Sequence, residues 1–119
     1  MKRVLIAEDE ILVAMDLKME LTLVGYSVIG ISSSAEQTIQ LTRAERPDII
    51  LMDVNLRGAV SGLQAAEKIQ KEFPIPILFV TAAPDNSTSE TIIHSKRNAL
   101  LSKPFSKQAL HSAIAKLLK

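Results

Sequence analysis

Short runs of apolar residues alternate along this chain with longer segments in which apolar and polar residues recur at helical spacing. Four of these runs are closed by a polar side chain. Residues 3–7 are followed by Glu8-Asp9, 75–80 by Thr81 and 99–102 by Lys103-Pro104, and the run 47–53 ends in Asp53 itself. Such short unbroken runs are typical of strands in a parallel sheet that is covered on both faces. Residues 26–31 alternate and contain β-branched side chains, so they predict a further strand.

The segments between these runs predict helices at residues 10–24, 35–46, 63–73, roughly 87–95 and 106–118. For the first helix we expect Asp9 as the N-cap and Gly25 as the end. Pro47 stops the second helix. The loop before the third helix covers residues 54–61, and we expect Gly58 and Gly62 to be its flexible points.

Strands and helices that alternate through short connections predict right-handed crossovers and one parallel sheet. We therefore expect an α/β fold of the flavodoxin-like doubly wound (βα)5 type, with a five-stranded parallel sheet in the order 2-1-3-4-5. A length of 119 residues predicts a single domain, residues 1–119. In this strand order the carboxyl ends of strands 1, 3 and 4 lie side by side, where ligands bind in open α/β sheets.

Composition narrows the class of protein. There is no cysteine, so disulfides and thiolate metal sites are excluded, and the longest apolar stretch, residues 11–15, is too short to span a membrane. We expect a soluble cytoplasmic domain. All 13 acidic residues lie at or before position 90, whereas six basic residues and no acidic one follow. The basic segment has one aromatic residue and no nucleic-acid motif, so it predicts a solvated helix face or a docking surface for an acidic protein partner, without direct nucleic acid binding.

Five side chains are expected to meet at the carboxyl ends of the strands: Glu8, Asp9, Asp53, Thr81 and Lys103. Each has an ordinary explanation on its own, as a helix cap, a loop hydroxyl or a solvated cation. The combination has little joint reason in packing. Three carboxylates in one crevice repel one another unless a cation neutralises them, and Mg²⁺ prefers such oxygen ligands. We expect the backbone carbonyl of Asn55 to complete the magnesium site.

A magnesium site that keeps open positions can accept phosphate oxygens. Asp53 could then attack a phosphoryl group and form an acyl phosphate. Transfer of this kind needs mainly positioning and stabilisation of charge on the equatorial oxygens. Lys103 and the Thr81 hydroxyl are the expected partners of those oxygens.

The chain resembles the receiver domain of two-component response regulators over its whole length. The matching motifs are VLIAEDE around Glu8 and Asp9, PDIILMD ending at Asp53, FVTA around Thr81 and SKPF around Lys103. The resemblance implies Asp53 as phosphoacceptor, the two acids as metal ligands, and Thr81 and Lys103 as the switch and charge partners. It also implies a cis bond at Lys103-Pro104, a sensor histidine kinase or phosphotransfer protein as donor, and no enzymatic activity beyond the domain's own phosphorylation and dephosphorylation.

Three departures from the family pattern affect the switching mechanism. Leu100 replaces the usual aromatic residue, Lys96-Arg97 replace a small pair, and the loop after Asp53 lacks its proline and is one residue longer. These traits resemble receivers that lack the aromatic switch residue. We expect activation by ordering of residues 82–95 around the phosphate, without ring rotation. The output surface would be the fourth helix, the fifth strand and the fifth helix.

Two other functions stay open from the sequence. One is a small-molecule phosphatase with an Asp nucleophile, although Asn55 stands where such enzymes usually have a second acid. The other is a receiver that is never phosphorylated and acts as a constitutive interaction module. A homodimer is a further assembly that the sequence allows.

Overall fold

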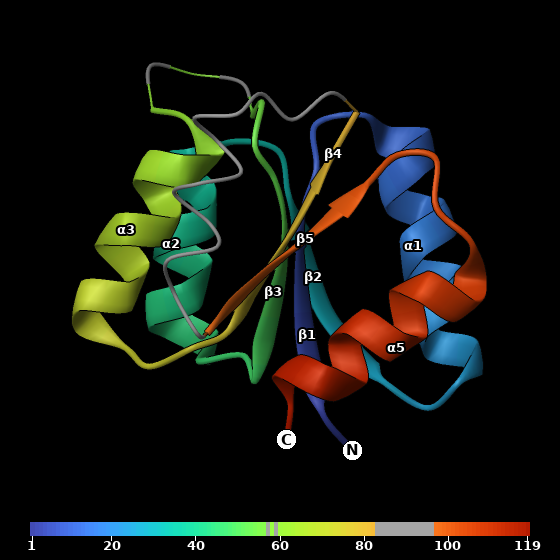
Figure 1. Cartoon of the computed structure of the whole chain (residues 1–119). Coiled ribbons are helices and arrows are strands. Elements are labelled where there is room, and N and C mark those ends of the chain that lie inside the picture. The colour runs from blue at the N-terminus through green and yellow to red at the C-terminus, as the bar shows by residue number, and fades with distance from the viewer. Residues whose placement is uncertain (57, 59, 83–96) are drawn as a thin grey trace.

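A computed structural model describes residues 1–56, 58, 60–82 and 97–119. Its strands are β1 (Arg3–Ala7), β2 (Ser27–Ser32), β3 (Ile49–Asp53), β4 (Ile77–Thr81) and β5 (Asn98–Ser102). They form one parallel sheet in the order β2-β1-β3-β4-β5, which confirms the predicted flavodoxin-like topology (Figure 1). The helix predicted near residues 87–95 lies outside the described residues.

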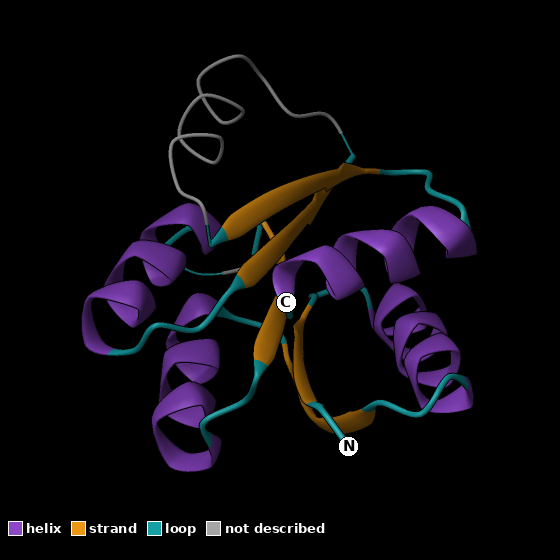
Figure 2. Cartoon of the chain, turned by 60° about the horizontal axis from the view of Figure 1, so that its bottom comes forward, coloured by secondary structure: helices purple, strands orange, loops and turns teal. Residues whose placement is uncertain are grey.

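Four helices in the described part of the chain cover the two faces of the sheet. They are α1 (Ile11–Leu23), α2 (Ala35–Glu45), α3 (Gly62–Glu72) and α5 (Lys107–Leu117). Helices α2 and α3 lie on one face, and α1 and α5 lie on the other (Figures 1 and 2). The unbroken apolar run of β3 follows from this, because Ile50 and Met52 pack under α2 and α3 while Ile49 and Leu51 pack under α1 and α5.

The beginning of α1 differs from the prediction. Its N-cap is Glu10 and not Asp9, and no side chain caps the first turn. The predicted cap was wrong because the strand-to-helix connection is one residue longer than the cap pattern suggested. Asp9 therefore lies before the helix, beside Glu8. The end is as predicted, since Gly25 has a φ of +100°, which favours glycine.

Gly58 and Gly62, the two glycines predicted as flexible points, have different structural roles. Gly58 has a φ of +112° and suits a turn, whereas Gly62 is the first residue of α3 and is buried. The prediction that Gly62 is a flexible point was wrong. Ser61 is the N-cap, and its side chain forms a capping box with Gln64. The start of α3 is thus firmly set.

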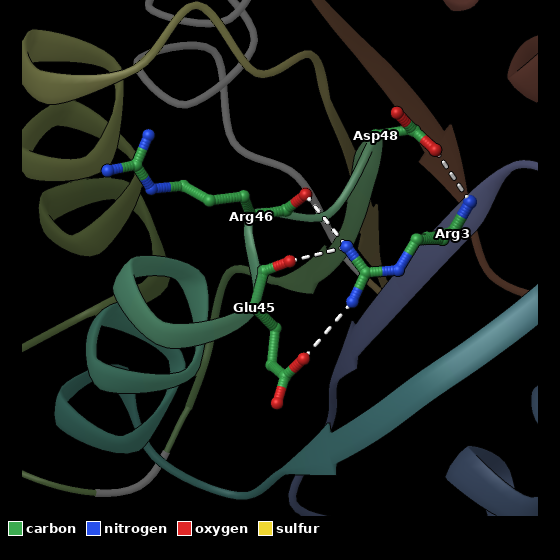
Figure 3. A network of polar contacts seen from close by, with 4 residues as sticks. All are labelled: Arg3, Glu45, Arg46 and Asp48. Carbon is green, nitrogen blue, oxygen red and sulfur yellow. Dashed lines mark hydrogen bonds and ion pairs between the residues drawn. The ribbon is translucent and has the colours of Figure 1, made fainter.

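Arg3 joins the beginning of β1 to the end of α2 at the end of the sheet where both chain termini lie (Figures 1 and 3). Its guanidinium donates to the main-chain carbonyls of Glu45 and Arg46 and pairs with the Glu45 carboxylate at 3.1 Å. Arg46 has a left-handed backbone, and its guanidinium lies 4.0 Å from the centre of the Phe73 ring. The Arg3 backbone N–H donates to Asp48 at 2.8 Å. This network fixes the α2–β3 connection.

Helix α1 is apolar on both of its sides. Ala14, Leu17 and Leu21 face the sheet and are buried, as a core helix requires. The large apolar side chains that are exposed in the described residues all belong to α1 and the residue after it, apart from Met1: Ile11, Leu12, Met15, Met19, Leu23 and Val24. In the described segments, no helix combines the length and hydropathy needed to span a membrane.

Candidate functional site at the carboxyl ends of the strands

The three predicted acids meet where β1 and β3 end. Glu8 and Asp9 follow β1 directly, and Asp53 is the last residue of β3, which pairs with β1. One carboxylate oxygen from each of the three lies within 4.8 Å of the others. Glu8 and Asp53 are buried and Asp9 is half-buried. Parallel pairing of neighbouring strands therefore converts a separation of more than 40 residues into one cluster of oxygen atoms.

Lys103, the residue after β5, completes the cluster. Its Nζ lies 3.0 Å from Glu8 Oε2 and 3.5 Å from Asp53 Oδ2, so one ammonium bridges two carboxylates. Burial raises the pKa of Glu8 above its usual value, although the hydrogen bonds from Lys103 and from the Glu10 amide oppose this effect. Burial alone would lower the pKa of Lys103, but the contacts with Glu8 and Asp53 outweigh it and the pKa is raised. Lys103 is therefore charged at neutral pH.

Main-chain groups orient two of the three carboxylates. Asp53 Oδ1 accepts a hydrogen bond of 2.9 Å from the Asn55 amide, and Glu8 Oε1 accepts one of 3.2 Å from the Glu10 amide. The sequence assigned the carbonyl of Asn55 to the metal, and this stays a prediction. The orienting amide was missed, although an Asp two residues before an Asn after a strand is a common turn signal.

Thr81 ends β4, the strand beside β3, and is buried. Asp53 is paired with Val80, so Thr81 lies one residue farther along the neighbouring strand. The Thr81 carbonyl accepts a hydrogen bond of 2.8 Å from the Lys103 amide, which ties the ends of β4 and β5 together. The Lys103-Pro104 bond is cis, as the resemblance implied.

The donor set fits a hard divalent cation. Three carboxylates supply three negative charges in a small volume, and Lys103 compensates only one of them. Carboxylate and carbonyl oxygens suit Mg²⁺, which keeps several waters and binds through few protein ligands. Glu8, Asp9 and Asp53 are thus the residues that would hold it.

Leu100, which replaces the usual aromatic residue of the family, lies in β5. Leu100 is half-buried in β5, pairs with Phe79 of β4 and packs against the core on the α2 and α3 side. The segment expected to become ordered, residues 82–95, lies outside the described residues apart from Ala82. Of the predicted output surface, only β5 and α5 are described.

Comparisons with known proteins agree with this geometry. The family model of the response regulator receiver domain matches residues 4–115. The phyllosphere-induced regulator PhyR of Methylorubrum extorquens is 32% identical over 116 residues, which are 97% of this chain and 43% of the relative. The transcriptional regulatory protein PdtaR of Mycobacterium tuberculosis is 35% identical over 113 residues, which are 95% of this chain and 55% of the relative. The chain spans about half the length of these curated relatives.

Solved structures of receiver domains are similar over nearly the whole chain. The receiver domain of a modulated diguanylate cyclase from Desulfovibrio desulfuricans has a TM-score of 0.89 at 31% identity and covers 99% of this chain and 94% of its own. The receiver domain of PhyR from Erythrobacter litoralis has a TM-score of 0.84 at 29% identity and covers 98% and 89%. With the strand order and the acidic cluster, these matches establish the family. The chain belongs to the response regulator receiver domain family of two-component signal transduction.

Proposed function

We propose that this domain accepts a phosphoryl group on Asp53 in an Mg²⁺-dependent reaction and that this modification is its signal. The observation that carries the proposal is the contact of Lys103 Nζ with both Glu8 and Asp53 inside a cluster of three carboxylates. Structural ion pairs rarely need a third acid at the same point. A phosphoryl-transfer site needs this excess of negative charge to hold its cation.

The reaction uses the Asp53 carboxylate as nucleophile. One carboxylate oxygen attacks the phosphorus of the donor, the donor's P–N or P–O bond breaks, and the leaving group departs with the bonding electron pair. The product is an acyl phosphate. Bound Mg²⁺ supplies positive charge for the phosphoryl oxygens. The Asn55 amide orients the nucleophile, and Lys103 would exchange its contact with Asp53 for a phosphoryl oxygen.

A mass measurement tests this proposal. Incubation of the protein with acetyl phosphate and Mg²⁺ should add the mass of one phosphoryl group, and Asp53→Asn or a chelator should abolish the addition. Unmodified wild-type protein under these conditions would instead support the constitutive interaction module. Repeated hydrolysis of a small ester such as p-nitrophenyl phosphate would support the phosphatase, and slow single modification supports a domain that acts only on itself.

The phosphodonor is a sensor histidine kinase or a phosphotransfer protein. Its docking surface is the exposed apolar side of α1, which begins two residues after Asp9. Monomeric proteins seldom expose such a patch without a partner. A helix with an apolar face could pack along Leu12, Met15 and Met19 and bring its phosphohistidine toward the end of β3.

We also propose a surface through which the phosphorylated domain passes on its signal. We place a downstream protein partner on the basic surface of α5, where Lys107 and Lys116 are exposed. A solved relative from Bartonella quintana is described as the anti-anti-sigma factor PhyR, and this chain covers 48% of it. Transcriptional control through such a partner is therefore one output to test for this domain, beside a homodimer.

A further inference from the structure

Gly62 makes the closest approach between α3 and the residue that bears the proposed phosphoacceptor. A Cβ atom at position 62 would lie 2.2 Å from the main-chain oxygen of Asp53 and 3.0 Å from both Cα and the carbonyl oxygen of Val54. All three atoms belong to the backbone, so no flexible side chain can move aside. The Gly62 amide also donates to the Val54 carbonyl at 3.0 Å.

This contact joins the end of β3 to the beginning of α3. Strand β3 ends at Asp53, and α3 begins at Gly62 directly against the Asp53 and Val54 backbone. Inside the loop between them, the Asn55 amide holds Asp53 Oδ1. The first turn of α3 therefore limits where the Asp53–Val54 backbone can lie. That backbone in turn orients the Asp53 carboxylate and the Asn55 carbonyl.

We propose that Gly62 is a positioning residue for phosphorylation: the first turn of α3 rests on the Asp53 main chain and so sets the geometry of the phosphoacceptor and of the metal site. This inference rests on the proposed function of Asp53. Reactive groups must be held within about 0.5 Å of their productive geometry. A methyl group at position 62 would have to move from 2.2 Å to at least 3.0 Å from the Asp53 oxygen, which exceeds that tolerance.

Helix propensity alone predicts that Gly62→Ala does not destabilise the protein. Gly62 is the first residue of α3, and alanine is a better helix former than glycine. A harmful effect must therefore come from the close approach. Gly30 is the matched control, because a Cβ there would meet only Leu5 at 3.7 Å and Leu41 at 3.8 Å, which are ordinary contacts.

The test compares Gly62→Ala with Gly30→Ala by three readouts. These are the amide resonance of Asn55 in metal-free protein, the affinity for Mg²⁺ alone, and the rate of phosphorylation by acetyl phosphate. We expect Gly62→Ala to shift the resonance, weaken Mg²⁺ binding and slow phosphorylation by about ten- to a hundredfold. Gly30→Ala should match the wild type in all three. A Gly62→Ala protein that is folded and unchanged in all three overturns the inference.

A second pair of variants decides the case in which Gly62→Ala does not fold. Ser61→Ala removes the cap that holds the first turn of α3, and Ser34→Ala removes the equivalent cap of α2. We expect only Ser61→Ala to weaken Mg²⁺ binding and shift the Asn55 resonance, and equal behaviour of both variants contradicts the inference. If wild-type protein takes no phosphate, the proposed function fails, while the Asn55 resonance still tests the positioning by Gly62.

Discussion

Lys103 is the residue on which the charge balance of the site depends. Its ammonium contacts the buried Glu8 and the buried Asp53, and its own side chain is only 20% exposed. Removal of one partner of such a pair strongly destabilises the folded protein, because the other charge stays buried without compensation. The same ammonium would compete with a metal cation for the Glu8 and Asp53 carboxylates. Lys103 should therefore favour folding and catalysis while it weakens metal binding.

Replacement of this lysine separates the two effects. For Lys103→Met we expect a loss of about 1–3 kcal/mol in the free energy of unfolding, a value reduced from the fully buried case by partial exposure. We also expect Mg²⁺ to bind up to about tenfold more tightly, equivalent to 1.4 kcal/mol, and phosphorylation by acetyl phosphate to be slower. Denaturant titration, calorimetry and mass spectrometry measure these three quantities.

The control for this variant is Lys71→Met, which removes an exposed ion pair with Glu67 at 3.6 Å on α3. It should change none of the three quantities measurably, because exposed pairs of this kind contribute little. Weaker Mg²⁺ binding by Lys103→Met would show that Lys103 supports the metal site and does not compete with it.

Single residues differ in how well the sequence predicts them. Glu8, Asp9, Asp53 and Lys103 could be assigned to one cluster because each follows an apolar run that ends at the same edge of a parallel sheet. The close approach at Gly62 could not be predicted. It depends on where α3 settles on the sheet, and that is decided by core packing between segments distant in sequence.

At the scale of elements, the join between α2 and β1 depends on Arg3. Its guanidinium satisfies two carbonyls at the carboxyl end of α2, where a cation also interacts favourably with the helix dipole (Figure 3). The ion pair with Glu45 is exposed on both sides and contributes less. The carbonyl contacts should therefore dominate the stabilisation by Arg3.

This ranking gives an ordered prediction for stability. Arg3→Ala should lower the free energy of unfolding by about 1–2 kcal/mol, and Glu45→Ala by less than 1 kcal/mol. Arg3→Lys should lie between the wild type and Arg3→Ala, since lysine keeps the charge without the planar fork of donors. Urea denaturation of the three variants measures this order, and a larger loss for Glu45→Ala than for Arg3→Ala would show that the ion pair dominates.

Helix α1 is the element whose surface is least explained by folding. Leu12 is 76% exposed and Met19 is 64% exposed, so neither contributes much to the core. The sequence already showed apolar residues at nearly every turn of this segment, but spacing alone does not reveal which of them remain uncovered. Only the observed orientation, with Ala14, Leu17 and Leu21 inside, separates the core side from the docking side.

Acidic residues on the exposed apolar side of α1 should slow phosphorylation by a protein donor but not by acetyl phosphate. Leu12→Glu combined with Met19→Glu should slow phosphotransfer from a histidine kinase or phosphotransfer protein by about tenfold or more, since hot-spot apolar contacts are lost. Phosphorylation by acetyl phosphate should keep its wild-type rate. The control is Glu67→Lys on the exposed surface of α3, and equal loss with both donors would place the effect in the site and not in docking.

For the molecule as a whole, the fold was predictable because pattern and topology agree at every level. The three central strands β1, β3 and β4 are buried and show as unbroken apolar runs, and short connections leave few topologies. Boundaries were less accurate. For example, β3 begins at Ile49, two residues after the start predicted at Pro47, and β4 begins at Ile77 and not at Ile75. Proline lacks an N–H for the ladder, so strands begin beyond such residues.

Signal transmission across the molecule gives the last prediction. Leu100 stands at the position of the usual aromatic residue, so no ring can rotate at this position, and Leu100 is packed against the core beside Phe79. A phosphoryl group on Asp53 adds charge and acceptors near Thr81, which directly precedes the segment 82–95.

We expect an acyl-phosphate mimic, beryllofluoride with Mg²⁺, to slow amide hydrogen exchange in residues 82–95. Leu100→Val should keep this protection, because the change alters packing volume but not the phosphate contacts. Asp53→Asn should abolish it. Exchange that the mimic leaves unchanged contradicts ordering of this segment, and loss of protection in Leu100→Val assigns the coupling to the leucine side chain.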